Sequence, residues 1–172
     1  MSVIVRPVAP GKAGLLPGLC ELLRDNVEGG ASVGFLVPLD AHAARDYWRE
    51  VLGAIGPSLA LWVAEQGGEI VGSVQLAPAG RENGRHRAEV QKLLVLQRHR
   101  GKHIASSLMA ALEAFATDQG RSLLVLDTQK GSAAEAVYQR LGWQRAGEIP
   151  DFAAMPDGRL TATVLYYKRL MA

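Results

Sequence analysis

Two short apolar runs joined by one amphipathic helix constrain this chain more than any other feature of its sequence. Residues 90–96 and 122–126 have the length and apolar content of buried strands, and residues 104–116 repeat apolar side chains at helical spacing. A strand, helix, strand connection of this kind normally makes the two strands parallel neighbours, with a right-handed crossover. Ligands of parallel sheets bind beyond the carboxyl ends of the strands, so we expect a site near Leu96 and Asp127. The apolar stripe of the helix comprises Ile104, Leu108, Leu112 and Phe115.

Further strands and helices are predicted on both sides of this crossover. Helical spacing indicates a helix over 15–27, a second after the N-cap residue Asp40, and a short one opened by a Ser-Ala-Ala-Glu capping box at 132–135. The other strands are predicted at 3–8, 59–65, 69–77, 143–149 and 161–168. This order predicts an α/β (α+β) fold with a central mixed, twisted sheet of about seven strands flanked by four helices. We expect residues 1–172 to form a single domain.

The composition excludes several other classes of protein. The chain has 172 residues, of which 48% are hydrophobic and 21% charged, as in ordinary globular domains. A formal net charge of +2 is too small for a general polyanion binder, so no nucleic-acid partner is expected. Cys20 stands alone, which excludes an internal disulfide. Without a signal-peptide pattern or a run of about 18 apolar residues, the sequence predicts a cytoplasmic protein with no membrane contact.

The turn that precedes the crossover helix is unusually basic. Helix N-termini have unpaired N–H groups and carry about half a positive charge, so they bind phosphates well. Gly101 allows close approach of the backbone to a ligand, and Arg100 and Lys102 add positive charge around the same point. The sequence therefore predicts that residues 100–106 form a pyrophosphate cradle, although neither the Walker pattern nor the dinucleotide glycine pattern occurs.

Three other interpretations of the basic turn stay open from the residues alone. An exposed turn between a strand and a helix is often charged without binding anything. A nucleic-acid patch would need aromatic residues interleaved with the basic ones, and this segment has few. His99 and His103 are four residues apart, as in some zinc helices, but Gly101 lies between them and no acidic ligand accompanies them. No metal is therefore expected.

The segment VLQRHRGKHIASSLM, residues 95–109, resembles the acyl-CoA-binding motif of the GCN5-related N-acetyltransferases (GNAT), [RQ]-x-x-G-x-[GA]. Arg100 and Ala105 match the ends of this motif, whereas His103 stands where the motif has its central glycine. AEAVYQRLGW, residues 134–143, resembles the family's helix that carries a tyrosine before a Leu-Gly-aromatic ending. The segments EVQKLLVL, LDTQKGSAAEAVYQRLGW and GEIPDFAAMPDGRLTATVLYYK are similar to the tabtoxin-resistance branch of these enzymes.

The resemblance implies a GNAT fold in which a splayed parallel strand pair binds acyl-CoA. The strand backbone would pair with the pantetheine arm, and the basic turn would hold the pyrophosphate. His103 would crowd the phosphates, donate a hydrogen bond as an imidazolium, or turn outward, and we expect the last of these. The implied cofactor-binding residues are Leu94, Val95, Leu96, Arg100, Gly101, Lys102, His103, Ile104, Ala105 and Ser106.

Acetyl transfer needs a neutral amine, support for the thioester oxygen and a proton for the leaving thiolate. A lysine-like amine has a pKa of about 10.4, so only about one molecule in a thousand is neutral at pH 7. The resemblance implies Glu89 and Asp127 as the base and the amine-orienting group, in an order that the sequence leaves open, although each could be a solvated strand end. It implies Tyr138 as the general acid, with core packing as the alternative role. A backbone N–H of Val95 or Leu96 is expected to support the oxygen.

The expected function is that of an acetyl-CoA-dependent N-acetyltransferase, in which a primary amine of a small molecule attacks acetyl-CoA directly in a ternary complex. The tabtoxin-resistance likeness points to an amino-acid-like toxin or antibiotic and a role in detoxification or resistance. The alternatives are a non-catalytic acyl-CoA sensor with the same fold, and a protein lysine or N-terminal acetyltransferase. The expected partners are acetyl-CoA and the amine, and a homodimer is left open.

Overall fold

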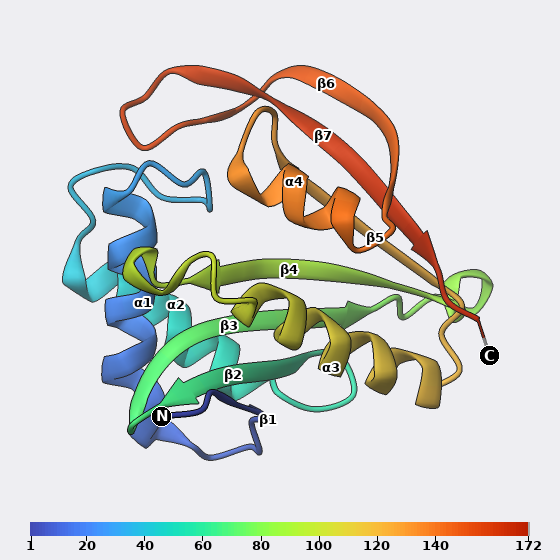
Figure 1. Cartoon of the computed structure of the whole chain (residues 1–172), viewed down its shortest axis with the longest axis horizontal. Helices are drawn as coiled ribbons and strands as arrows, with labels where there is room; N and C mark the ends of the chain where they lie inside the picture. Colours follow the sequence, from blue (N-terminus) through green and yellow to red (C-terminus); the bar gives the residue numbers. More distant parts are fainter. Residues whose placement is uncertain (172) are drawn as a thin grey trace.

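The structure is a computed structural model that describes residues 1–171. Its elements follow the predicted order (Figure 1). The helices are α1 (Leu16–Glu28), α2 (Ala41–Ala54), α3 (Ile104–Asp118) and α4 (Ala133–Arg140). The strands are β1 (Ile4–Pro7), β2 (Ala60–Gln66), β3 (Glu69–Pro78), β4 (Arg87–Val95), β5 (Leu123–Gln129), β6 (Gln144–Ala154) and β7 (Leu160–Arg169). Within these residues, no helix combines the length and the hydrophobicity needed to cross a bilayer.

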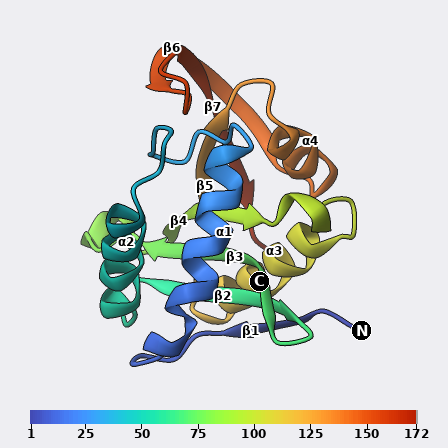
Figure 2. The same ribbon diagram turned by 90° about the vertical axis from the view of Figure 1, so that its left-hand side faces the viewer.

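The seven strands form one mixed sheet in the order β1-β2-β3-β4-β5-β7-β6. All neighbouring pairs are antiparallel except β4 and β5, which are parallel as the crossover predicted. Helices α1 and α2 cover one face of the sheet, whereas α3 and α4 lie on the other side (Figure 2). The predicted fold class is therefore confirmed.

Local chemistry explains where the first two helices begin. Pro17 lies in the first turn of α1, where its missing N–H has no helical acceptor to lose. Asp40 is the N-cap of α2, and its Oδ1 accepts a hydrogen bond of 3.2 Å from the backbone N–H of His42. Both features follow from the sequence alone.

The predicted capping box at the start of α4 is wrong in part. Ser132 is the N-cap residue, but its side chain makes no capping bond and its Oγ lies 3.4 Å from Oγ1 of Thr128. Glu135 does turn back, yet it accepts from the N–H of Gly131 (2.6 Å) and from the hydroxyl of Tyr166 (2.6 Å). Neighbours on β5, on the β5–α4 turn and on β7 thus compete for the two side chains that a capping box would pair with each other.

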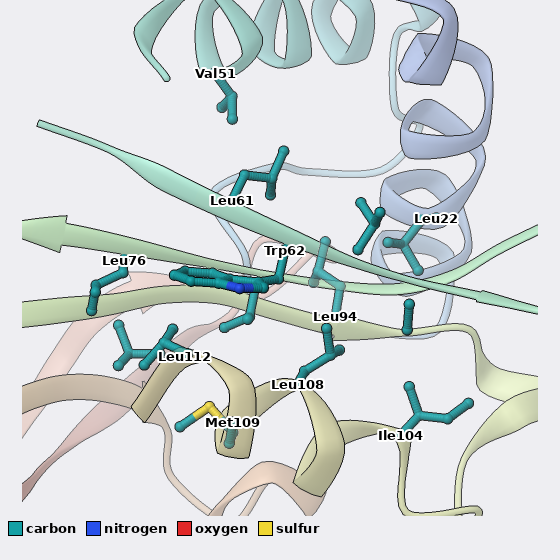
Figure 3. Close-up of a cluster of buried hydrophobic side chains, with 14 of the residues drawn as sticks. Leu22, Val51, Leu61, Trp62, Leu76, Leu94, Ile104, Leu108, Met109 and Leu112 are labelled. Atoms are coloured by element: carbon teal, nitrogen blue, oxygen red, sulfur yellow. The ribbon is translucent and has the colours of Figure 1, made fainter. Parts of the chain in front are cut away.

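Hydrophobic side chains pack on both faces of the sheet (Figure 3). Val51 of α2 lies toward Leu61 of β2, and Trp62, the next residue along that strand, lies on the face covered by α3. Phe115, predicted in the apolar stripe of α3, is instead 38% exposed. Its ring packs against Trp62 in an edge-to-face arrangement, with the ring centroids 5.1 Å apart and the ring planes at 70°.

The parallel pairing of β4 and β5 is short. Only Arg87, Ala88 and Glu89 pair with β5, after which the two strands diverge (Figure 1). β5 also continues beyond the predicted end at residue 126, because residues 127–129 pair with β7. On its other side, β4 carries a bulge opposite residues 73–75 of β3, where Lys92 has a φ of +50°. Divergence and bulge together shape the site.

Candidate active site

The divergence of β4 and β5 opens a cleft of about 1270 Å³. Its wall brings together most of the predicted site residues: Glu89, Leu94, Val95, Arg100, Gly101, His103, Ile104, Ala105, Ser106, Asp127 and Tyr138. Leu96 and Lys102 were predicted with them but do not line the cleft. Leu96 is buried in the core, and Lys102 is exposed beyond the rim.

Of the three residues predicted to turn their backbone toward the cofactor, Leu94, Val95 and Leu96, the hydrogen-bond pattern with β3 leaves Val95 for that role. The N–H of Leu96 donates to the carbonyl of Val71 on β3 (2.9 Å), so it is not available to a thioester oxygen. In an antiparallel ladder, hydrogen-bonded and non-hydrogen-bonded residues alternate, so the backbone groups of Val95 are directed away from β3. β5 has already diverged at this point, which leaves the N–H of Val95 facing the cleft.

A buried asparagine of α1 holds this part of the site together. Asn26 is only 3% exposed, and its Nδ2 donates to the carbonyls of Leu22 (2.9 Å) and Val95 (3.3 Å). Its Oδ1 accepts a hydrogen bond of 3.1 Å from the guanidinium of Arg100. Asn26 was not predicted from the sequence, although a polar residue on the apolar stripe of a helix was a visible signal.

The basic turn has the geometry that an anion needs. Gly101 has a φ of +75°, and His103, the N-cap of α3, lies in the left-handed region with φ 62° and ψ 18°. That conformation costs a residue with a side chain about 1–2 kcal/mol, which explains the glycine in the family motif. The side chain of His103 is exposed, and the N–H groups of the first turn have no acceptor within the helix.

Glu89 lies on the face of the sheet that α1 and α2 cover. The amide of Gln75 on β3 donates to the hydroxyl of Tyr47 on α2 (3.0 Å), so Gln75 points to that face. Gln91 is directly opposite Gln75 and shares its face, and Glu89 is two residues before Gln91 on the same strand. Glu89 is exposed to the cleft and makes no ion pair with residues 1–171.

Asp127 faces the same side as Glu89. Glu89 pairs with Val125 in the parallel ladder, and Asp127 follows two residues later on β5. Its Oδ2 accepts a hydrogen bond of 2.7 Å from Oγ1 of Thr163 on β7, which holds the carboxylate in place. The two predicted carboxylates therefore lie on the same side of the cleft.

Tyr138 reaches the cleft from α4, on the opposite side of the sheet. It is 5% exposed and packs between the rings of Trp143 and Tyr166. Its hydroxyl makes no hydrogen bond with residues 1–171, yet it is not among their fully enclosed polar atoms, so it opens to the cleft. Burial raises the pKa of Tyr138 well above the ordinary tyrosine value, and the charge of Asp127 raises it further. Core packing and a position in the cleft are thus combined in one residue.

Lys92 is a second cleft residue that the sequence analysis missed. It lines the cleft from the bulge of β4 and is partly buried. Burial lowers its pKa below the ordinary lysine value, and the charges of Asp127 and Glu89 offset part of that change. A lysine inside the largely apolar run VQKLLVL was the available signal.

Comparisons with known proteins agree with this architecture. The Acetyltransferase (GNAT) family profile matches residues 21–143. N-acetyltransferase 8 from Rattus norvegicus is 41% identical over 91 residues, which cover 51% of this chain and 40% of that protein. The match therefore spans less than half the length of this curated relative.

Solved structures match over nearly the whole chain. Ribosomal-protein-alanine N-acetyltransferase from Brucella melitensis has a TM-score of 0.79 at 25% identity, covering 97% of this chain and 99% of that one. A GNAT superfamily phosphinothricin acetyltransferase from Sinorhizobium meliloti, solved with acetyl-CoA, has a TM-score of 0.79 at 19% identity, covering 99% and 89%. The matched sequence profile and the shared fold lead to one conclusion: this chain belongs to the GNAT family of acetyltransferases.

Proposed function

We propose that the chain is an acetyl-CoA-dependent N-acetyltransferase that acts on a primary amine of a small molecule. The observation that carries this proposal is the meeting of unlike groups in one cleft. Glu89 and Asp127 lie on one side, Tyr138 opens to the same space from the other, and the N–H of Val95 lies where the strands diverge. A binding module would need the anion-binding turn but neither the carboxylates nor the buried phenol.

The residues of the turn fit acetyl-CoA. Unpaired first-turn N–H groups, together with Arg100 held by Asn26, suit a pyrophosphate. The free N–H of Val95 suits an amide or thioester carbonyl. When bound, acetyl-CoA would supply the acetyl thioester that the amine attacks.

The side chains divide the proton transfers between them. Glu89 has no partner among residues 1–171 and would take the ammonium proton, directly or through water, whereas Asp127 is held by Thr163 and would orient the amine. The nitrogen–carbon bond would form as the carbon–sulfur bond breaks, and Tyr138 would give its proton to the departing sulfur. The acylated nitrogen then carries two hydrogens; it would pass one to the tyrosinate and keep the other as the amide N–H, while Glu89 releases its proton to water. The raised pKa of Tyr138 keeps this acid protonated at neutral pH.

The finer expectations remain part of the proposal. Matched enzymes are named for acceptors as different as a ribosomal-protein alanine and phosphinothricin, so family membership leaves the acceptor open. The tabtoxin-resistance likeness, a resistance role, a cytoplasmic location, a single domain over residues 1–172 and a homodimer stay predictions from the sequence. A protein acetyltransferase is the second candidate that the Brucella melitensis match favours.

The test is release of free thiol from acetyl-CoA against a panel of primary amines, with Tyr138→Phe as the variant. We expect amine-dependent release in the wild type and a loss of about 10²–10⁴-fold in kcat in the variant, the usual contribution of a general acid. Tyr167→Phe is the matched control, because the Tyr167 hydroxyl bonds Gln144 and does not line the cleft. Acetyl-CoA binding without turnover on any amine would instead identify a sensor.

A further inference from the structure

The bulge of β4 changes the direction of one charged side chain. Regular alternation would place Lys92 with Ala88 and Val90, on the face covered by α3. At the bulge, Lys92 instead adopts a φ of +50°, and its side chain reaches the loop between α1 and α2. A Cβ on Gly34 of that loop would lie 3.8 Å from Lys92 Nζ. The ammonium therefore lies on the side of the cleft that also holds Glu89 and Asp127.

The ammonium of Lys92 has no partner among residues 1–171. It forms no ion pair and no hydrogen bond with them, although the residue is partly buried. Lys168, which is also partly buried, shows the usual arrangement: its Nζ contacts Glu113 at 2.9 Å and the carbonyl of Leu141 at 2.7 Å. Partly buried cations are normally paired, because removing an ammonium from water is costly.

The charges of this side of the cleft suit a ligand with both signs of charge. Glu89 and Asp127 attract a protonated amine, and both act electrostatically on Lys92 without contacting it. Lys92 is then the group left to meet an anion. We infer that the acceptor is a zwitterion, an amine with a carboxylate close to it, and that Lys92 binds this carboxylate. The inference rests on the proposed function, and it names the substrate class of the same site.

This inference separates the two candidate functions. A free amino acid or a related small molecule has a carboxylate beside its amine. The N-terminal residue of a peptide has an amide at that position, which carries no charge. Lys92 would thus favour the small molecule over a protein N-terminus.

The experiment compares matched amines. Phenylalanine, phenylalaninamide and phenethylamine share a side chain and differ in the carboxylate, as do methionine, methioninamide and 3-(methylthio)propylamine. Thiol release from acetyl-CoA is measured for the wild type, Lys92→Met, Lys92→Arg and the control Lys130→Met, whose lysine pairs with Glu148 outside the cleft. We expect Lys92→Met to lower kcat/KM for the amino acids by about 10- to 100-fold, and to change kcat/KM for the analogues that lack a carboxylate by less than about threefold. Lys92→Arg should restore part of the loss.

Two results would overturn the inference. One is an equal loss of kcat/KM for all three members of a series, which would mean that Lys92 acts on Glu89 and Asp127 or on the cofactor. The other is a wild type that prefers the phenethylamine-type member. If no amine is acetylated, calorimetry of the same probes in the presence of coenzyme A decides the matter. If the amino acid binds and Lys92→Met weakens this binding, the carboxylate site is supported although the proposed function fails. If the amino acid and the matching amine without a carboxylate bind equally, or neither binds, the site is rejected.

Discussion

The two halves of the cleft are built in different ways. The cofactor half is nearly continuous in sequence, since the backbone of Val95 and the turn over residues 100–106 follow one another along the chain. The acceptor half brings together side chains from β4, β5 and β7, next to the loop after α1. The first half depends on local backbone geometry and the second on distant side chains. Changes in one half should therefore leave the binding function of the other largely intact.

Among the variants that test the separation of the two halves, the largest effect is expected from Glu89→Gln in the acceptor half. Loss of the base should lower kcat/KM about 100-fold near pH 7. The difference in kcat/KM between the wild type and the variant should shrink as the pH rises toward about 10, because the substrate ammonium then loses its proton in solution without a base. Tyr138 should not limit this recovery, since its raised pKa keeps it protonated through that range. A pH–rate profile of both proteins measures the effect.

Binding of acetyl-CoA is the control for this variant. Its Kd should stay within about twofold of the wild type, and Glu82→Gln, an exposed change outside the cleft, should leave the profile unchanged. A loss that is constant from pH 7 to about pH 10 would show that Glu89 is not the base.

A smaller effect is expected from Arg100→Met in the cofactor half. The guanidinium is held by Asn26 at the start of the turn, and a lost charge-assisted contact to a phosphate should raise the Kd for acetyl-CoA by about tenfold. The KM for the amine should be unchanged at saturating acetyl-CoA. Calorimetry and steady-state kinetics measure the two constants. Arg98→Met is the neighbouring control, because Arg98 pairs with Glu69 and does not line the cleft. An equal increase in the Kd for acetyl-CoA and the KM for the amine would show that the two halves do not bind independently.

The smallest effect is expected from His103→Gly. Glycine adopts the left-handed conformation without the steric cost of a Cβ, so the free energy of unfolding should rise by up to about 1 kcal/mol. Urea unfolding measures this change. Gly101→Ala is the converse variant: φ there is +75° and no atom lies near the new Cβ, so the loss should be of similar size. A destabilised His103→Gly would show that the imidazole makes a contact of its own.

Features that depend on local sequence patterns could be predicted, and features that depend on contacts between segments could not. The element order, the parallel pair and the first turn of α3 follow from spacing and capping residues, and the structure confirms the fold. Asn26 and Lys92 were missed, because a single polar residue in an apolar pattern does not indicate what it will meet. The capping box was only partly right, since Thr128 and Tyr166 compete for its two side chains. Apart from Thr128, which lies four residues before Ser132, the missing information was a contact between distant segments.

The sequence by itself determined the crossover between β4 and β5, the basic turn and the family to which the chain belongs. Only the tertiary structure decided that Val95, and not Leu96, presents its N–H to the cleft, and that Lys92 lies on the acceptor side. The physical reason is the two-residue period of a strand. One extra residue at a bulge reverses the direction of every group beyond it, and the position of that bulge is set by pairing with a neighbouring strand.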